Sequence, residues 1–294
     1  MRSNKLTCVL GLALMLMLAA TLASGADAPK LTFKFSKTNV LGALQTFPYG
    51  VNSAGVTVGQ YEDKATLLHG YVLNGKKLTK LDDPKGTKTA CFGLNPNGAI
   101  AIVGYYINSK GNAVGFLYRS GKFTDIPGPK GATSSDASAI NDSGAIVGSY
   151  TDSSGINHGF LLKGTTYRTL NVPGATYTVG TGINNKGSIV LYWEDSKGLL
   201  ESSIYNGKTY KTINVPGAVG GSAAQAINSA GDVVYQWADS SAVHGALLRA
   251  GKYYKFDYPK SVFTSGDGIN DKNLLVGAYE AETNGPFSGF KATY

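Results

Sequence analysis

The sequence contains few of the residues that mark disulfide scaffolds, zinc sites and acid–base catalysis. Its 294 residues include two cysteines, three methionines, three histidines and two tryptophans. Cys8 lies within the first 25 residues, so residues 26–294 retain only Cys91, and a disulfide within them is excluded. A single cysteine also excludes the usual cysteine-based zinc sites. We expect Cys91 to be a small buried apolar residue, and we expect no metal or cofactor.

Long apolar runs are absent after the N-terminal segment. Arg2 and Lys5 precede an apolar run from Leu6 to Leu22, and the small residues Ala23-Ser24-Gly25 follow it. This order is typical of a cleaved signal peptide, residues 1–25. An uncleaved membrane anchor is the alternative, because the run approaches the roughly 18 residues that can begin to span a bilayer. We expect a secreted or periplasmic protein with no membrane span after cleavage of the leader.

Acidic residues are fewer than basic ones. The chain has 27 Lys and Arg against 19 Asp and Glu, and 25 against 19, a difference of about +6, once Arg2 and Lys5 are removed. This moderate excess permits contact with anionic surfaces. The sequence has no Gly-x-Ser-x-Gly elbow, no phosphate-binding loop and no His-Glu-x-x-His motif. We expect no nucleic-acid partner, and we assign no catalytic residue.

A repeat dominates what the sequence does contain. A small residue, an aliphatic residue and an asparagine recur six times, and the asparagines are separated by 43, 46, 43, 44 and 42 residues. The six phrases are Gly50-Val51-Asn52, Gly93-Leu94-Asn95, Ala139-Ile140-Asn141, Gly182-Ile183-Asn184, Ala226-Ile227-Asn228 and Gly268-Ile269-Asn270. A fixed period in this range is typical of repeat architectures in which each unit is one supersecondary piece.

Each unit of about 44 residues has the punctuation of four short strands. Glycine-containing turns separate the apolar stretches, and the fourth stretch usually ends at a proline. Such units repeated radially are the blades of a β-propeller. Leu31–Phe35 reads as a fourth strand with no blade before it, and Gly289–Tyr294 reads as a third strand with none after it. We therefore predict an all-β, six-bladed β-propeller of four-stranded antiparallel blades over residues 26–294, with the N-terminal strand completing the last blade.

The repeated phrases resemble those of the HAF-repeat extracellular proteins of bacteria. The matching phrases are Gly-Ile-Asn-Asn-x-Gly at residues 182–187, Ile-Val-Gly-x-Tyr at 146–150, His-Gly-Phe at 158–160 and Pro-Gly-Ala at 173–175. The family takes its name from His-Ala-Phe, which is His-Gly-Phe in this chain. The resemblance covers about residues 31–294. It implies an exported, propeller-like repeat protein with no established activity.

Two sets of repeated residues invite a functional interpretation. The histidines His69, His158 and His244 occupy one position of the repeat, so we expect a structural role rather than a shared metal site. The second stretch of every unit ends on an aromatic residue: Tyr61, Tyr106, Tyr150, Trp193, Trp237 and Tyr279. We expect these rings to pack between blades. Trp193 and Trp237 are also candidate ligand contacts, because their repeats carry Leu191 and Tyr235 where others carry glycine.

The turns of the repeat separate charge between two faces. In an antiparallel blade the first and third turns emerge together, and the second turn emerges with the loop to the next blade. The third turns carry Lys76, Lys122, Lys208 and Lys252, whereas the second turns are rich in Asp and Glu. These four lysines are candidate ligand-binding residues for an anionic polysaccharide or a cell-envelope surface. Solvated turns without a ligand are the alternative.

The function indicated is an exported binding or scaffold module, expected to be monomeric, whose ligand the sequence does not identify. The alternative is an extracellular carbohydrate-active hydrolase or lyase, and a third reading is a structural surface protein. An enzyme of this fold needs acids or bases on non-equivalent loops that meet near the axis. Among the irregular loops at residues 85–92, 127–137 and 217–224, only Asp136 is acidic.

Overall fold

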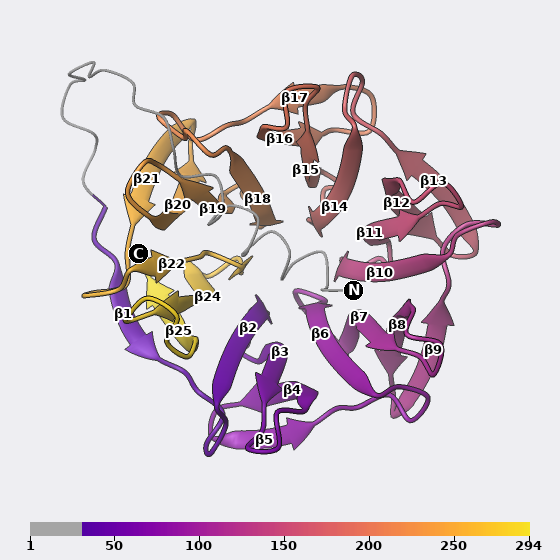
Figure 1. The fold of residues 1–294 in the computed structure, drawn as a ribbon, viewed down its shortest axis with the longest axis horizontal. Coiled ribbons are helices and arrows are strands. Elements are labelled where there is room, and N and C mark those ends of the chain that lie inside the picture. Colours follow the sequence, from indigo (N-terminus) through magenta and orange to yellow (C-terminus); the bar gives the residue numbers. More distant parts are fainter. Residues whose placement is uncertain (1–30) are drawn as a thin grey trace.

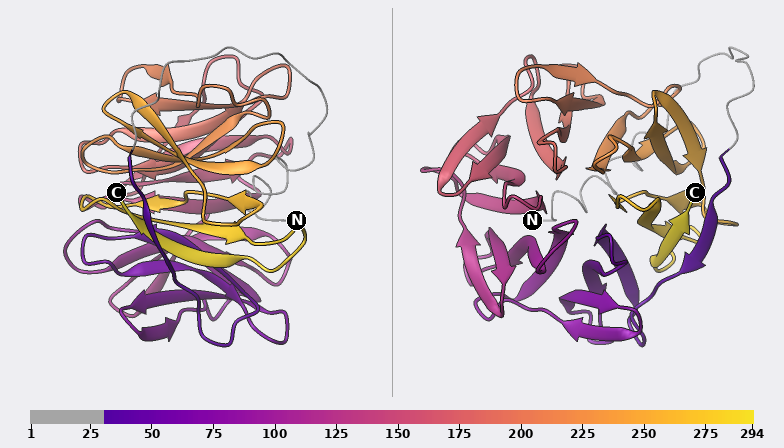
Figure 2. Two further views of the ribbon diagram at one scale, coloured as in Figure 1. Left: turned by 90° about the vertical axis from the view of Figure 1, so that its left-hand side faces the viewer. Right: turned by 180° about the vertical axis from the view of Figure 1, so that it is seen from behind.

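The computed structural model describes residues 31–294 (Figure 1), so the expected signal peptide, residues 1–25, lies outside the described residues. Every regular element in residues 31–294 is a strand, and the strands are arranged around a central axis. No helix in this part of the chain could cross a membrane. Figure 2 shows the same ring from the side and from behind. The predicted all-β propeller architecture is confirmed.

Four repeats form separate four-stranded antiparallel sheets, each in the order of the sequence. Repeat one is β2 (Gln45–Val51), β3 (Thr57–Glu62), β4 (Leu68–Asn74) and β5 (Lys77–Lys80). Repeat two is β6 (Lys88–Leu94), β7 (Ala101–Ile107), β8 (Ala113–Arg119) and β9 (Lys122–Ile126). Repeat three is β10 (Ser134–Ile140), β11 (Ile146–Thr151), β12 (Asn157–Lys163) and β13 (Thr166–Leu170). Repeat four is β14 (Tyr177–Ile183), β15 (Ile189–Glu194), β16 (Leu200–Tyr205) and β17 (Tyr210–Thr212).

The prediction of six separate blades is wrong, because the remaining strands share one nine-stranded sheet. Repeat five is β18 (Ser222–Ile227), β19 (Val233–Ala238), β20 (Val243–Arg249) and β21 (Lys252–Phe256). Repeat six is β22 (Phe263–Thr264), β23 (Gly268–Ile269), β24 (Leu274–Glu280) and β25 (Ser288–Thr293), joined by β1 (Lys34–Lys37). The two are linked by a parallel bridge between Val243 and Phe263. Gly266, in the break between β22 and β23, also donates its N–H to the Tyr235 carbonyl at 3.1 Å.

The N-terminal strand completes the last repeat, as predicted. β1 pairs antiparallel with β25, from Lys34 opposite Thr293 to Lys37 opposite Phe290. The two strands lie side by side at the rim in Figures 1 and 2. The Phe35 ring packs edge-on against Phe290 with centroids 5.4 Å apart. The last repeat is thus assembled from both ends of the described chain.

The first strands of the repeats line the axis and contain a β-bulge in repeats one to five. A bulge places two residues opposite one and re-aims a side chain. The small residue of the repeat phrase lies where neighbouring first strands nearly touch. A Cβ on Gly268 would approach the Tyr49 carbonyl oxygen to 2.6 Å, and one on Gly93 would approach that of Ser138 to 2.7 Å. Gly or Ala at this position therefore makes room for the neighbouring first strands at the axis.

The repeated asparagine joins neighbouring repeats. The Asn184 Oδ1 accepts the N–H groups of Lys186 and Ser188, and its Nδ2 donates to the Asn228 carbonyl at 3.0 Å. The Nδ2 groups of Asn141, Asn228 and Asn270 likewise donate to the carbonyl of the asparagine in the next repeat, at 3.1, 3.2 and 2.8 Å. All six asparagines are buried. A buried amide satisfied in this way fixes the turn and the distance between adjacent first strands.

Candidate functional sites

The four predicted lysines all lie exposed in turns between third and fourth strands. Lys76 follows β4, Lys122 begins β9, Lys208 precedes β17 and Lys252 begins β21. Because strands in each sheet alternate in direction, these turns share one face of the ring with the first turns. We call this the basic face. Within residues 31–294, none of the four lysines forms an ion pair.

Lysines that do pair with carboxylates lie near the opposite face, which carries the second turns and the loops between repeats. The Lys80 Nζ is 3.1 Å from Asp82, and the Lys85 Nζ is 2.8 Å from Asp125. We call this the loop face. The contrast indicates that the charge of the four predicted lysines is available to an external anion, whereas part of the positive charge near the loop face is neutralised internally.

The three histidines form a repeated bridge near the loop face. In each case the ring links a second-turn aspartate to a polar residue after the fourth strand. The contacts are Asp63–His69–Asp82 at 3.2 and 2.8 Å, Asp152–His158–Asn171 at 3.0 and 3.1 Å, and Asp239–His244–Asp257 at 3.3 and 2.9 Å. We call this arrangement the clasp. It confirms a structural role for the histidines, since it ties the second turn to the outer strand.

The strand-two aromatic of each clasped repeat lies against its histidine. Ring centroids are 5.2 Å apart for Tyr61 and His69, 5.1 Å for Tyr150 and His158, and 4.9 Å for Trp237 and His244. The predicted packing between repeats is present for Trp237, which joins a core cluster with Val190, Ile213 and Val215 of repeat four. Tyr106 packs similarly with Val58 and Leu81.

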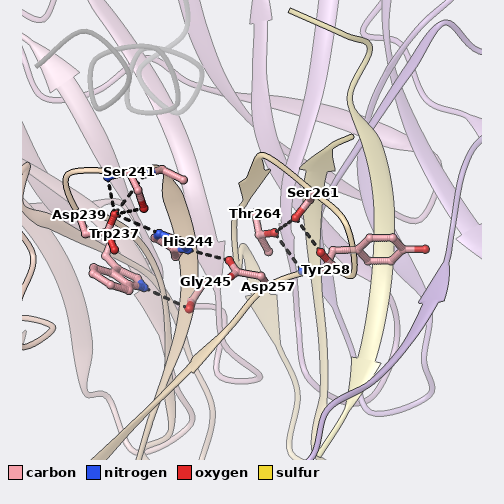
Figure 3. A network of polar contacts seen from close by, with 10 residues as sticks. Trp237, Asp239, Ser241, His244, Gly245, Asp257, Tyr258, Ser261 and Thr264 are labelled. Atoms are coloured by element: carbon pink, nitrogen blue, oxygen red, sulfur yellow. Dashed lines mark hydrogen bonds and ion pairs between the residues drawn. The ribbon is translucent and has the colours of Figure 1, made fainter. Parts of the chain in front are cut away.

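Trp237 lies beside His244 and bonds to Gly245 (Figure 3). It is 2% exposed, and its Nε1–H donates to the Gly245 carbonyl at 3.2 Å. His244 stacks on the ring, and the Lys255 ammonium lies 3.8 Å from the ring centroid. Burial also lowers the pKa of Lys255. A ring without a free face cannot stack on a ligand, so in this structure Trp237 acts as a packing residue.

Trp193 has a different environment. Its side chain is partly exposed, and its Nε1–H donates to the Ser203 Oγ at 3.0 Å. Repeat four has Glu201, opposite Trp193 in the sheet, where the clasped repeats have histidine. Within residues 31–294 no aromatic ring or cation lies over this indole. The sequence prediction singled out both tryptophans, and the structure places only Trp193 where one of its faces could be reached.

The axial channel is the place where the repeats differ most. It has a volume of about 570 Å³ including its open mouth. The side chains at the bulges face it: Tyr49, Phe92, Ser138, Thr181 and Gln225, with Asp267 at the equivalent position of repeat six. Sequence reasoning missed Asp267 because a bulge cannot be located from composition. Asp136, the one acidic residue of the irregular loops at 85–92, 127–137 and 217–224, is buried in β10 and accepts a hydrogen bond from Ser138 at 2.9 Å.

No family model matches the chain, and no curated protein sequence matches it significantly. Solved structures do match. SapL1 lectin in complex with alpha methyl fucoside superposes with a TM-score of 0.56 and 11% identity, over 85% of this chain and 93% of the lectin. AofleA from Arthrobotrys oligospora superposes with a TM-score of 0.51 and 13% identity, over 87% and 88%.

An enzyme is also among these matches. The acylaminoacyl peptidase of Pyrococcus horikoshii superposes with a TM-score of 0.51 and 13% identity, over 82% of this chain and 42% of the peptidase. At such identities the likeness establishes the fold alone, because one fold carries many functions. The class that the fold and the comparisons define is therefore the β-propeller.

Proposed function

We propose that this chain is a carbohydrate-binding β-propeller whose basic face takes an anionic polysaccharide. The observation that carries the proposal is the placement of Lys76, Lys122, Lys208 and Lys252, which lie exposed at equivalent turns on one face and make no ion pair with any described residue. A polyanion that contacts several such turns gains many weak attractions at once, and it releases its condensed counterions. The ring thus offers multivalent rather than single-pocket binding.

Two further points support the proposal. SapL1 lectin, which has the same fold, is seen in complex with alpha methyl fucoside, so a propeller of this size can carry a saccharide. The resemblance of the repeated phrases to HAF-repeat extracellular proteins favours export to a compartment where such polymers occur. We propose membership of that family, cleavage of residues 1–25 and a secreted or periplasmic location as parts of the same account.

The test compares two variants of equal charge. In the first, Lys76, Lys122, Lys208 and Lys252 are changed to Gln. In the second, the exposed loop-face lysines Lys64, Lys110, Lys130 and Lys197 are changed to Gln, which removes the same charge from the other side. One exposed ion pair typically contributes about 0.2–1 kcal/mol. Loss of four such contacts should therefore lower the affinity for polygalacturonate roughly tenfold or more in the first variant. The second variant should bind nearly as tightly as the unmodified protein.

Equal losses in the two variants would contradict the proposal, because affinity would then follow net charge rather than one face. Unchanged affinity in the basic-face variant would contradict it as well. Thermal unfolding of both variants should match that of the unmodified protein, since all eight lysines are exposed.

A further inference from the structure

We propose that Trp193, Glu201 and Asp195 form a second saccharide site near the loop face of repeat four, and that it takes a neutral pyranose. This inference goes beyond the polyanion binding proposed above, since it concerns another face of the ring and an uncharged ligand. It starts from a comparison of the repeats, which share one framework of residues and differ here in a single side chain.

Repeat four has every part of the clasp except the histidine. Asp195 begins its second turn, as Asp152 does in repeat three, and its Oδ1 accepts the Leu199 N–H at 2.9 Å. Asn214 follows the fourth strand, as Asn171 does, and its Oδ1 accepts the Ser202 N–H at 2.8 Å. Glu201 stands where His158 stands in repeat three. The clasp is therefore left open by one substitution.

Without the histidine, no aromatic ring lies against Trp193 within residues 31–294. In repeats one, three and five, the imidazole packs against the strand-two aromatic with ring centroids 4.9–5.2 Å apart. Glu201 carries no ring, and within residues 31–294 Trp193 belongs to no buried core cluster. The bond from its Nε1 to Ser203 fixes one edge of the indole. An oriented, partly exposed indole is a platform for the C–H groups of a sugar ring.

Two carboxylates stand in the same open clasp. The Glu201 Oε2 accepts a hydrogen bond from the Asn214 side chain, which holds the carboxylate in place. The Glu201 Oε1 accepts no hydrogen bond within residues 31–294, and neither does the Asp195 Oδ2, whose counterpart in repeat three binds His158. Backbone hydrogen bonds from Leu199 lower the pKa of Asp195, which keeps it ionised at neutral pH.

These groups define the class of ligand. Ionised carboxylates accept hydrogen bonds from sugar hydroxyls and cannot donate. They repel uronic acids and other anionic sugars, which are the ligands proposed for the basic face. A neutral pyranose offers a C–H face to Trp193 and hydroxyl donors to Glu201 and Asp195. The two faces of the ring would thus select saccharides of opposite charge character.

The test uses intrinsic fluorescence, because Trp193 and Trp237 are the only tryptophans of the chain. The full-length domain is titrated with the methyl glycosides of glucose, galactose, mannose and fucose, and with galacturonate. At least one neutral glycoside should shift the emission saturably and independently of salt, while galacturonate should not. Trp193→Phe, which leaves the buried Trp237 in place, should abolish the shift.

The discriminating variant is Glu201→His, which supplies the missing member of the clasp. It should raise the unfolding temperature and remove the sugar response, because the imidazole would then bridge Asp195 and Asn214 and cover the indole. Glu201→Gln should weaken binding roughly tenfold or more without raising the unfolding temperature, because a hydrogen bond to a charged group is replaced by one to a neutral amide.

The inference is overturned if no neutral glycoside changes the emission, or if Glu201→His binds as well as the unmodified protein. The basic-face variant distinguishes a failure of this inference from a failure of the proposed function. It should retain the full response to the neutral glycoside, so that failure of polygalacturonate binding and failure of the Trp193 site are distinct results.

Discussion

His244 lies between two carboxylates, and this geometry makes the clasp of repeat five depend on pH. Its Nδ1 is 2.9 Å from Asp257 and its Nε2 is 3.3 Å from Asp239, while the Trp237 ring covers one face. Ionised carboxylates only accept hydrogen bonds and a neutral imidazole has one N–H, so the protonated ring suits both partners. The hydrogen bond to Asp257 is the main reason that the pKa of His244 is raised, with Asp239 adding to it against the opposing effect of burial.

A raised pKa in the folded state stabilises the fold below the unfolded pKa of about 6.5, and this stabilisation is lost as the pH rises through the folded value. We therefore expect His244→Gln to lower the unfolding temperature by about 2–4 °C near pH 5.5 and by less near pH 8.5. Calorimetry of the variant and the unmodified protein at both pH values measures this difference. Asp257→Asn, which makes this clasp like that of repeat three, should flatten the dependence. An equal effect of His244→Gln at both pH values would refute the charged clasp.

The clasp also shows which site residues could be found from sequence. The three histidines were identified as equivalent, but their partners were not. A second-turn aspartate, a histidine five or six residues later and an Asp or Asn 13 residues after that recur in repeats one, three and five. That spacing was the available signal. The absence of a histidine ring beside Trp193 could not be predicted, because it depends on which side chain lies opposite Trp193 in the sheet.

At the scale of the structural element, the asparagine turn is the unit that carries the repeat. Asn184 caps its own turn and bonds to the next repeat. Asn184→Ala should cost about 2–3 kcal/mol of unfolding free energy, since it removes two hydrogen bonds within its own turn and the buried hydrogen bond to the next repeat. Asn206→Ala is the matched control, because Asn206 also caps a turn but is exposed and, among the described residues, bonds only within its own turn.

Chemical denaturation measures both changes. Asn206→Ala should cost less than about 1 kcal/mol, as expected for an exposed cap. A similar cost for the two variants would mean that the inter-repeat bond contributes little and that the asparagine serves only its local turn. The local cap was predictable from the sequence, because Asn and Gly have known turn preferences. The sequence could not predict the bond to the next repeat, which depends on how close the first strands lie.

At the scale of the whole molecule, the pairing of β1 with β25 joins the two ends of the described chain and helps to close the ring. Phe35 packs on Phe290 with centroids 5.4 Å apart, and Tyr167 packs on Phe160 at the same distance in repeat three. The two aromatics are equivalent in the repeat, but β13 is tied to β12 by a hairpin, whereas β1 reaches β25 only through the closure. Phe35→Ala should therefore loosen a larger region than Tyr167→Ala.

Hydrogen exchange measures that region, because local opening appears as lost amide protection. Phe35→Ala should reduce protection in β24, β25 and the adjoining β2, whereas Tyr167→Ala should reduce it mainly in β12 and β13. Equal, local losses in both variants would show that the closure is no weaker than any other strand pair.

The architecture was predictable from sequence to the extent that it is periodic. Four strands per repeat, the small residues at the axis and the pairing of the N-terminal strand with the last repeat all follow from the spacing of the phrases and their turn residues. The joining of repeats five and six was not predictable. It arises from the parallel bridge between Val243 and Phe263 and from the break at Gly266, whose N–H bonds to the Tyr235 carbonyl and where a Cβ would lie 3.0 Å from the Phe256 ring.

The central claim is that the basic face binds an anionic polysaccharide, and the most direct measurement is the affinity of the unmodified protein for polygalacturonate as a function of salt. We expect saturable binding that weakens steeply between about 50 and 500 mM salt, since each lysine contact releases counterions. The neutral polymer dextran should not compete for this face. Absence of saturable binding, or binding that salt leaves unchanged, would contradict the account.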